Sequence, residues 1–125
     1  MDTPDFSAFC DRSEAECPER EILTHVMSRW GSLALILLLS RSYRFNELRR
    51  RIGGVSDKML SQTLRTLEGD GFIHRHDFQE VPPRVEYSLT PLGRGAAEHV
   101  TLMGKWVAAN TQNVLAARKR HRDQN

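Results

Sequence analysis

Hydrophobic and polar positions follow the periods of regular secondary structure along most of this chain, and their order predicts five helices and one β-hairpin. In four segments, apolar residues recur at helical spacing and leave a polar face. A further segment, 32–40, is apolar on all sides, which predicts a helix buried in the core. The four amphipathic segments are 18–29, 45–52, 56–70 and a last helix from Pro91 to about residue 118.

Residues with special backbone preferences mark where these helices begin and end. Pro18 fits the first position of a helix, where its missing N–H costs nothing, and Thr90-Pro91 repeats this signal. Ser56 is a suitable N-cap, and the Gly53-Gly54 pair before it predicts a tight turn between two helices. Gly31 is expected to break or bend the chain.

The hydrophobic period changes to two after residue 71. Segments 72–78 and 85–89 alternate apolar and polar residues and predict two antiparallel strands, with a stiff, proline-rich loop at 81–84 between them. Tyr43-Arg44 is expected to add a short strand. The predicted fold is therefore mainly α with a small β-hairpin: a winged helix–turn–helix with flanking N- and C-terminal dimerisation helices.

The helix predicted at 56–70 has two unlike faces. Its inward face is expected to contain Met59, Leu60, Thr63, Leu64 and Leu67. In a winged helix, this second helix of the helix–turn–helix enters the DNA major groove, where polar side chains reach base edges or phosphates. The candidate DNA-binding residues of the helix are Ser56, Asp57, Lys58, Ser61, Gln62 and Arg65.

Arginines beside this helix are candidates for contacts with the DNA backbone. Arg49 and Arg50 lie just before the predicted turn, where phosphate contacts would fix the docking register, and Arg44 precedes them. Arg84 follows two prolines at the tip of the wing, which limits the entropy lost when its side chain is held against DNA. Arginine dominates the cationic residues, with 15 Arg against 3 Lys, and suits bidentate contacts with phosphates and bases.

Two other classes of function remain open at this point. A polar outer face is also typical of any solvated helix, and some winged helices are protein-interaction modules without specific DNA binding. A thiol-dependent redox enzyme is supported by nothing beyond Cys17. Because paired carboxylates, a serine–histidine–acid set and a glycine-rich phosphate loop are not evident, we expect neither an enzyme nor a cofactor.

Length and charge divide the chain into a leader, a body and a tail. The 125 residues suffice for one domain, which we expect at 17–117. Residues 1–16 are expected to be a flexible, acidic leader, and 118–125 a basic tail. Residues 1–21 contain seven acidic and two basic residues, whereas residues 22–125 contain nine acidic and sixteen basic ones. The body is therefore basic, which favours a nucleic-acid partner.

Neither export nor a metal site is expected. The longest apolar run has seven residues, at 33–39, and a membrane span needs about 20. Cys10 and Cys17 make neither a disulfide framework nor a zinc site, so a reducing, cytoplasmic location fits best. His74 and His76 point to one face of a predicted strand without a third ligand nearby.

Several runs of residues form a specific pattern. They are Cys17-Pro18, Trp30, Arg-Phe-Asn-Glu-Leu-Arg-Arg at 44–50, the runs 56–64 and 67–73, and Val-Pro-Pro-Arg-Val-Glu-Tyr-Ser-Leu-Thr-Pro-Leu-Gly at 81–93. In this order they resemble the HxlR-type transcriptional regulators, and the resemblance covers about residues 17–107. The family usually has a glycine-lysine pair before the tryptophan, where this chain has Ser28-Arg29.

The resemblance implies a bacterial homodimer that represses or activates nearby genes. By position, the recognition helix is 56–70 and the wing is 79–85. The resemblance also implies that Cys17 senses an oxidant or a small electrophile, because several family members use the cysteine at this position. The positive end of a helix dipole favours a reactive thiolate there, whereas the neighbouring glutamates favour the neutral thiol. The alternative is a small apolar cap packed at the dimer interface.

The outer helices are expected to make the dimer. The last helix has an apolar stripe too long for a small domain to bury against itself, and the first helix is expected to pack beside it across a two-fold axis. Such a dimer would hold two recognition helices about 34–36 Å apart, or one DNA turn. The candidate dimer residues are Leu92, Ala96, Val100, Met103, Trp106 and Val107.

Overall fold

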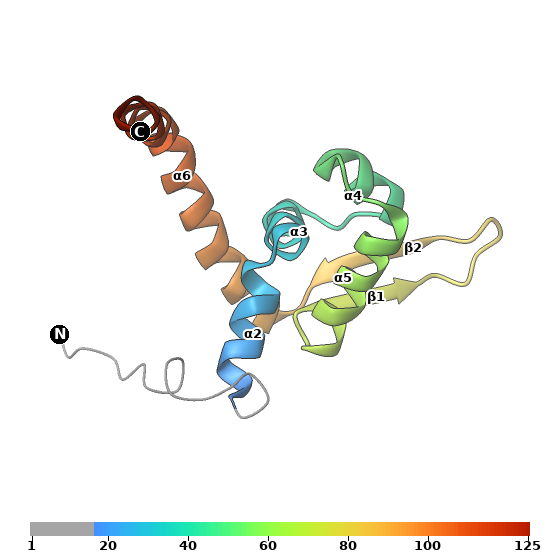
Figure 1. The fold of residues 1–125 in the computed structure, drawn as a ribbon. Helices are drawn as coiled ribbons and strands as arrows, with labels where there is room; N and C mark the ends of the chain where they lie inside the picture. Colours follow the sequence, from blue (N-terminus) through green and yellow to red (C-terminus); the bar gives the residue numbers. More distant parts are fainter. Residues whose placement is uncertain (1–16) are drawn as a thin grey trace.

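The computed structural model describes residues 17–125, so the acidic leader expected at 1–16, including Cys10, lies outside the described residues (Figure 1). Within the described part, the order of elements matches the prediction of five helices and one hairpin. The elements are α2 (Pro18–Met27), α3 (Arg29–Ser40), α4 (Phe45–Ile52), α5 (Asp57–Gly69), β1 (Ile73–Asp77), β2 (Val85–Leu89) and α6 (Pro91–Gln124).

The break between the first two helices lies at Ser28. This residue is extended, with ψ 155°, and α2 and α3 are bent by 69° from each other. Its hydroxyl donates to the carbonyl O of His25 at 2.9 Å and accepts the N–H of Gly31 at 3.1 Å. The expectation that Gly31 breaks the chain is wrong, because Gly31 lies in the first turn of α3. Glycine is required there, since a Cβ would collide with Ser28 Oγ and lie 2.6 Å from the His25 carbonyl O.

The helix–turn–helix forms as predicted. The turn uses Gly53 and Gly54 at φ 73° and 75°, and Ser56 Oγ accepts the N–H of Met59 at 3.1 Å to cap α5. Leu60, Leu64 and Leu67 form the buried stripe of α5. Met59 was expected on this stripe, but its side chain is 44% exposed, because it lies at the border of the buried and outer faces.

The hairpin pairs β1 with β2 in antiparallel register, from Ile73 opposite Leu89 to Asp77 opposite Val85. The expected short strand is a single bridge, in which Tyr43 and Tyr87 exchange two backbone hydrogen bonds of 3.0 and 2.8 Å. This bridge ties the segment before α4 to the wing. The helical part of the protein and the hairpin are therefore fixed relative to each other.

The core is centred on α3, which packs against α2, α4, α5, α6 and β2. Figure 1 shows α3 end-on between α6 on one side and the α4–α5 pair on the other. Leu35, Leu48, Leu60 and Leu64 are at most 1% exposed in this core. Burial of each such side chain contributes about 1.5–3 kcal/mol. The prediction that the all-apolar segment is a core helix is confirmed.

The last helix is longer than predicted. It continues to Gln124 instead of ending near residue 118, so the expected basic tail is helical. Its first turns pack on the core through Gly93, Ala97 and Val100, and residues 111–125 are exposed. Among the described residues, no single helix is long and apolar enough to cross a membrane, although α2 and α3 together meet the requirement of length and composition.

Candidate nucleic-acid interface

The outer face of α5 presents the polar residues that the sequence assigns to DNA. Because the leucine stripe anchors the opposite face in the core, these side chains point outward. Ser61 is half-buried and the others are exposed. The exposed ones are Ser56, Asp57, Lys58, Gln62 and Arg65.

Two of these candidates also hold α5 in place. Ser56 provides the N-cap described above, and the Asp57 carboxylate lies 3.1 Å from Nε of Arg49 in α4. Both charged side chains are exposed, so this ion pair adds little stability. It does place a cation beside the only carboxylate among the α5 candidates, which lowers the repulsion between Asp57 and a nearby phosphate.

Three of the four predicted backbone-contacting arginines lie around one cleft. Arg44 and Arg50 belong to the start and the outer side of α4, and Arg84 reaches the cleft from the wing, 34 residues further along the chain. The cleft has a volume of about 570 Å³. Its other lining residues are Phe45, Asn46, Glu47, Pro83 and Val85. Arg49 lies outside this set and pairs with Asp57 instead.

The wing holds Arg84 by contacts that sequence reasoning missed. Its guanidinium carbon lies 3.6 Å from the centroid of the Phe78 ring, and Nη2 lies 3.7 Å from the Glu80 carboxylate. The Phe78 N–H also donates to the Arg84 carbonyl O at 3.0 Å, which closes the loop. A signal was present, because Phe78 is an aromatic residue placed at the other end of the same loop.

Glu47 fixes the edge of the cleft at the start of α4. Its carboxylate accepts the backbone N–H of Arg44 at 2.9 Å, and Nη2 of Arg41 lies 3.4 Å from its other oxygen. The hydrogen bond from Arg44 is the main cause of a lowered pKa of Glu47, and the positive charge of Arg41 acts in the same direction. Arg44 and Arg41 therefore hold the Glu47 carboxylate in place, and its negative charge partly offsets the positive charge of the arginines at the cleft.

Cys17 lies at the other side of the molecule, as the N-cap residue of α2. Its side chain is fully buried, and Sγ donates to the Glu19 carboxylate at 3.2 Å. The predicted place at a helix N-terminus is confirmed. The thiol contacts a carboxylate of the first helical turn, as the neighbouring glutamates suggested.

The candidate dimer residues of α6 fall into two groups. Leu92, Met103, Trp106 and Val107 are 50–63% exposed, and Ala96 is half-buried. Val100 is 5% exposed and packs in the core of its own chain, so its side chain is already covered. The dimer candidates leave out further exposed apolar residues, which are Leu102, Val114 and Leu115 of α6 and Ile22 of α2.

A groove of about 560 Å³ runs between α2 and α6. Leu23 and Met27 line it from α2, and Leu92 and Met103 line it from α6. Because these side chains are 48–63% exposed, the two helices present one continuous apolar surface. Exposed apolar patches of this kind mark sites where other molecules bind.

The two wing histidines lie side by side, with ring centroids 5.9 Å apart, and the His76 ring contacts Phe78 edge-on. Among residues 17–125, no group of three or more His, Cys, Asp or Glu side chains is arranged to hold a metal ion. The histidines therefore belong to the aromatic surface of the wing.

Known proteins share this arrangement. The HTH-type transcriptional regulator YtfH of Escherichia coli (strain K12) is 53% identical over 103 residues, which cover 82% of each chain. The structure of the transcriptional regulator ytfH from Salmonella typhimurium has a TM-score of 0.80 at 50% identity, over 84% of this chain and 94% of that chain. The redox regulator HypR in its oxidized form has a TM-score of 0.70 at 37% identity, over 75% of this chain and 97% of that chain.

The helix–turn–helix, the wing and the long last helix thus recur together in these regulators. The profile of the HxlR-like helix-turn-helix family matches residues 25–115, from the end of α2 to the second half of α6. The chain therefore belongs to the HxlR-like helix-turn-helix family, whose members are transcriptional regulators and not enzymes.

Proposed function

We propose that two copies of this chain bind one pseudo-palindromic site on double-stranded DNA in the cytoplasm and so regulate transcription. The observation that carries the proposal is the cleft in which Arg44, Arg50 and Arg84 come together beside the exposed face of α5. Three guanidinium groups around one opening suit a phosphate of the DNA backbone, because each presents several fixed N–H donors.

The division of labour follows from where the side chains lie. Lys58, Ser61, Gln62 and Arg65 on the outer face of α5 would read base edges in the major groove or fix the helix there. The arginine cleft would hold the backbone next to that groove, which sets the register without reading sequence. Arg84 is suited to this task because its stacking on Phe78 limits the freedom it loses on binding.

The apolar surface of α2 and α6 supports a homodimer. Leu102 is 63% exposed and Trp106 is 59% exposed, which is costly for helices that face only water. A second copy offers the same surface, and an isologous contact would cover both at once. Such a dimer would present two α5 helices to successive turns of one DNA duplex, about 34–36 Å apart.

We further propose that Cys17 responds to an oxidant or a small electrophile. HypR, which is similar to this chain, is described as a redox regulator. The buried Cys17 is the N-cap residue of α2, a helix of the proposed dimer surface, and its Sγ donates to Glu19 in the first turn, so modification of the thiol would disturb this helix. Cys17→Ser should abolish the change in DNA affinity that hypochlorite causes; an unchanged response of Cys17→Ser would contradict this role.

The experiment that tests DNA binding is fluorescence anisotropy of the reduced protein with the intergenic DNA beside its own gene. Titrations at two salt concentrations, with unrelated DNA as competitor, should show competitor-resistant binding that weakens steeply with salt. Arg50→Ala should lower the salt slope by about one phosphate contact, whereas Arg94→Ala on α6 should retain it. Weak binding that is equal for both DNAs and insensitive to salt would instead favour a protein-interaction module.

A further inference from the structure

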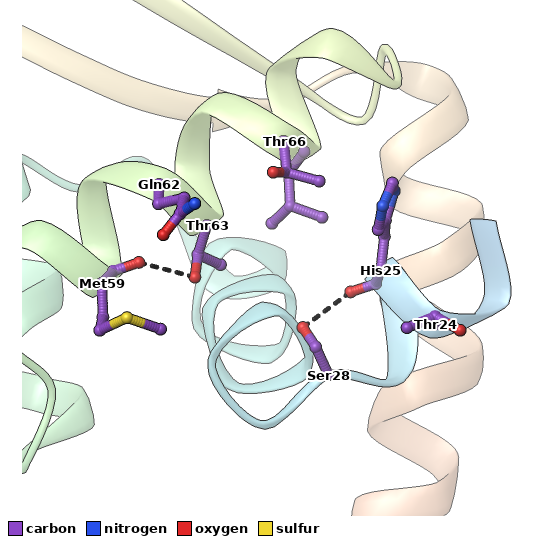
Figure 2. A pocket seen from close by; sticks show the side chains of 8 residues that line it. Thr24, His25, Ser28, Met59, Gln62, Thr63 and Thr66 are labelled. Atoms are coloured by element: carbon purple, nitrogen blue, oxygen red, sulfur yellow. Dashed lines mark hydrogen bonds between the residues drawn. The ribbon is translucent and has the colours of Figure 1, made fainter. Parts of the chain in front are cut away.

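A small pocket lies where the α2–α3 break meets the middle of α5. Figure 2 shows Met59, Gln62, Thr63 and Thr66 of α5 facing Ser28 and His25 across it. Its volume is about 220 Å³. An apolar cavity of about 150 Å³ is enough to hold benzene. The pocket therefore has room for one aromatic ring with a small substituent.

The charge of the lining restricts the ligand. None of the eight lining residues is an aspartate, glutamate, lysine or arginine. The only titratable one, His25, has its Nδ1 held at 2.6 Å from the Asp70 carboxylate. A carboxylate ligand would find no cation that is free of a carboxylate partner and would approach the charge of Asp70, so an uncharged molecule is favoured.

The hydrogen bonds of the lining restrict the ligand further. Four hydroxyls border the pocket, and those of Thr24, Ser28 and Thr63 each donate their proton to a backbone carbonyl three or four residues earlier. Thr24 donates to Arg20 O at 2.9 Å, Ser28 to His25 O at 2.9 Å and Thr63 to Met59 O at 2.8 Å. A hydroxyl has one proton and two acceptor lone pairs, so what these groups still offer is acceptor sites. Toward these three hydroxyls, a matching ligand must donate.

We propose that this pocket binds a small, uncharged aromatic alcohol or phenol. The ring would lie against Met59, Leu67 and the threonine methyl groups, and the ligand O–H would donate to the Thr63 hydroxyl. Gln62 can supply the complementary donor through its side-chain amide, because an amide both donates and accepts.

The pocket connects the two surfaces on which the proposed function rests. Its α2 wall belongs to the helix whose Leu23 and Met27 lie on the apolar surface, and its α5 wall includes Gln62 of the DNA-binding face. The His25–Asp70 hydrogen bond ties the same two helices beside the pocket. A bound ring would change the spacing of α2 and α5, and with it the affinity for DNA; this consequence rests on the proposed function.

Binding itself is testable without DNA. In protein labelled with ¹³C at the methionine methyl groups, phenol should shift the Met59 resonance with a saturable, about millimolar Kd. Met27 and Met103 line the α2–α6 groove and serve as internal controls. Anisole, which has the same ring but no O–H donor, should bind about three- to tenfold more weakly, and benzoate should not bind. Equal shifts of all three methionines, or no saturable shift of Met59, would overturn the proposal.

Two variants separate the contribution of the ligand's hydrogen bond from that of the pocket volume. Thr63→Val removes the acceptor at constant shape and should reduce phenol affinity to that of anisole. The matched control is Thr111→Val, because Thr111 makes the same bond to the carbonyl four residues earlier, 2.7 Å to Val107 O, on exposed α6. Thr66→Leu should fill the pocket and abolish binding of both probes. Retained discrimination between phenol and anisole in Thr63→Val would overturn the donor match.

The regulatory consequence has its own readout. Phenol at a concentration that saturates Met59 should change the anisotropy-derived Kd for the intergenic DNA at least about threefold, and Thr66→Leu should remove this effect. An unchanged Kd with Met59 saturated would overturn the coupling. Failure of the apo protein to bind any DNA would contradict the proposed function and leave the phenol site standing.

Discussion

Helices α5 and α6 are both amphipathic, yet they differ in what covers their apolar residues. Leu60, Leu64 and Leu67 of α5 are at most 1% exposed, whereas Leu102 and Trp106 of α6 are about 60% exposed. A single chain of 125 residues buries the apolar stripe along the whole 13-residue α5 but only the first turns of the 34-residue α6. The two helices therefore offer different surfaces: a polar face that fits a polyanion and an apolar face that fits a second copy.

The charges beside each helix strengthen the contrast. The cleft next to α5 contains Arg44, Arg50 and Arg84, and the wing fixes Arg84 through Phe78. The groove next to α6 is lined almost entirely by apolar side chains. This difference supports the proposal that the short helix serves recognition and the long helix serves association, although their periodicity in the sequence is similar.

The largest expected effect is on the stability of the fold, after a change in the buried leucine stripe of α5. Leu64→Ala removes a fully covered side chain of α5 and leaves a cavity, so it should destabilise the fold by about 2–5 kcal/mol. Urea unfolding monitored by circular dichroism measures this. Val81→Ala, at a residue that is 98% exposed, should stay within about 0.5 kcal/mol. A loss below about 1 kcal/mol for Leu64→Ala would contradict the burial of this stripe.

The next largest effect is expected on self-association through the exposed apolar residues of α6. Trp106→Ser should weaken self-association by about 2 kcal/mol or more, since exposed tryptophans at the centre of an interface are typical hot spots. Sedimentation equilibrium measures the association constant, and helix content should be retained because Trp106 is 59% exposed in the single chain. Arg118→Ser on the same helix is the control. Identical association of wild type and Trp106→Ser would place the dimer surface elsewhere.

Substitution of two arginines tests the DNA-binding surface formed by α5 and the wing. Arg65→Ala should cost about 1–3 kcal/mol in specific DNA binding if its guanidinium meets a base, with a smaller effect on unrelated DNA. Arg84→Ala should weaken binding to all sequences alike and reduce the salt slope by about one contact. Anisotropy titrations with specific and unrelated duplexes separate the two patterns. If Arg84→Ala impaired only specific binding and Arg65→Ala impaired binding to all sequences, the wing would read bases and α5 would contact the backbone.

The smallest effect concerns Glu47 at the edge of the arginine cleft. The hydrogen bond from the Arg44 N–H, aided by the charge of Arg41, lowers the pKa of Glu47 in the folded protein. Its contribution to stability is therefore present above the pKa of the unfolded chain and is lost as the pH falls through the folded pKa. Glu47→Gln should have a slightly lower melting temperature than wild type at neutral pH, and the gap should close in acid.

Glu98→Gln, an exposed change on α6, provides the reference for thermal melts across the same pH series. If the gap between wild type and Glu47→Gln stays constant as the pH falls, the carboxylate of Glu47 does not act through its charge.

Local sequence signals were sufficient for much of the fold. The Gly53-Gly54 turn, the Ser56 cap and the strand at 85–89 each depend on neighbouring residues, and the structure confirms them. The Ser28 break was missed because serine is also compatible with a helix interior. Its effect comes from a hydroxyl that bonds both His25 and Gly31.

The hydrophobic period of the sequence does not predict which helices and strands pack against each other. Helical spacing groups Val100 with Met103, but only the packing on α3 shows that Val100 is covered and Met103 is not. The arginine cleft forms only because the wing lies next to α4 in the fold. The position of Arg84 depends on the stacking of its guanidinium on the Phe78 ring. Such contacts between distant segments depend on the whole fold and not on any one stretch of sequence.

We propose that α6 joins two chains so that two α5 helices bind one duplex. Sedimentation equilibrium of the reduced protein with the duplex that binds it in the anisotropy experiment measures this directly. We expect a complex with two 14.3 kDa chains per duplex, and its dissociation to DNA and single chains in Trp106→Ser. A complex with one chain per duplex, bound as tightly by Trp106→Ser as by wild type, would contradict it.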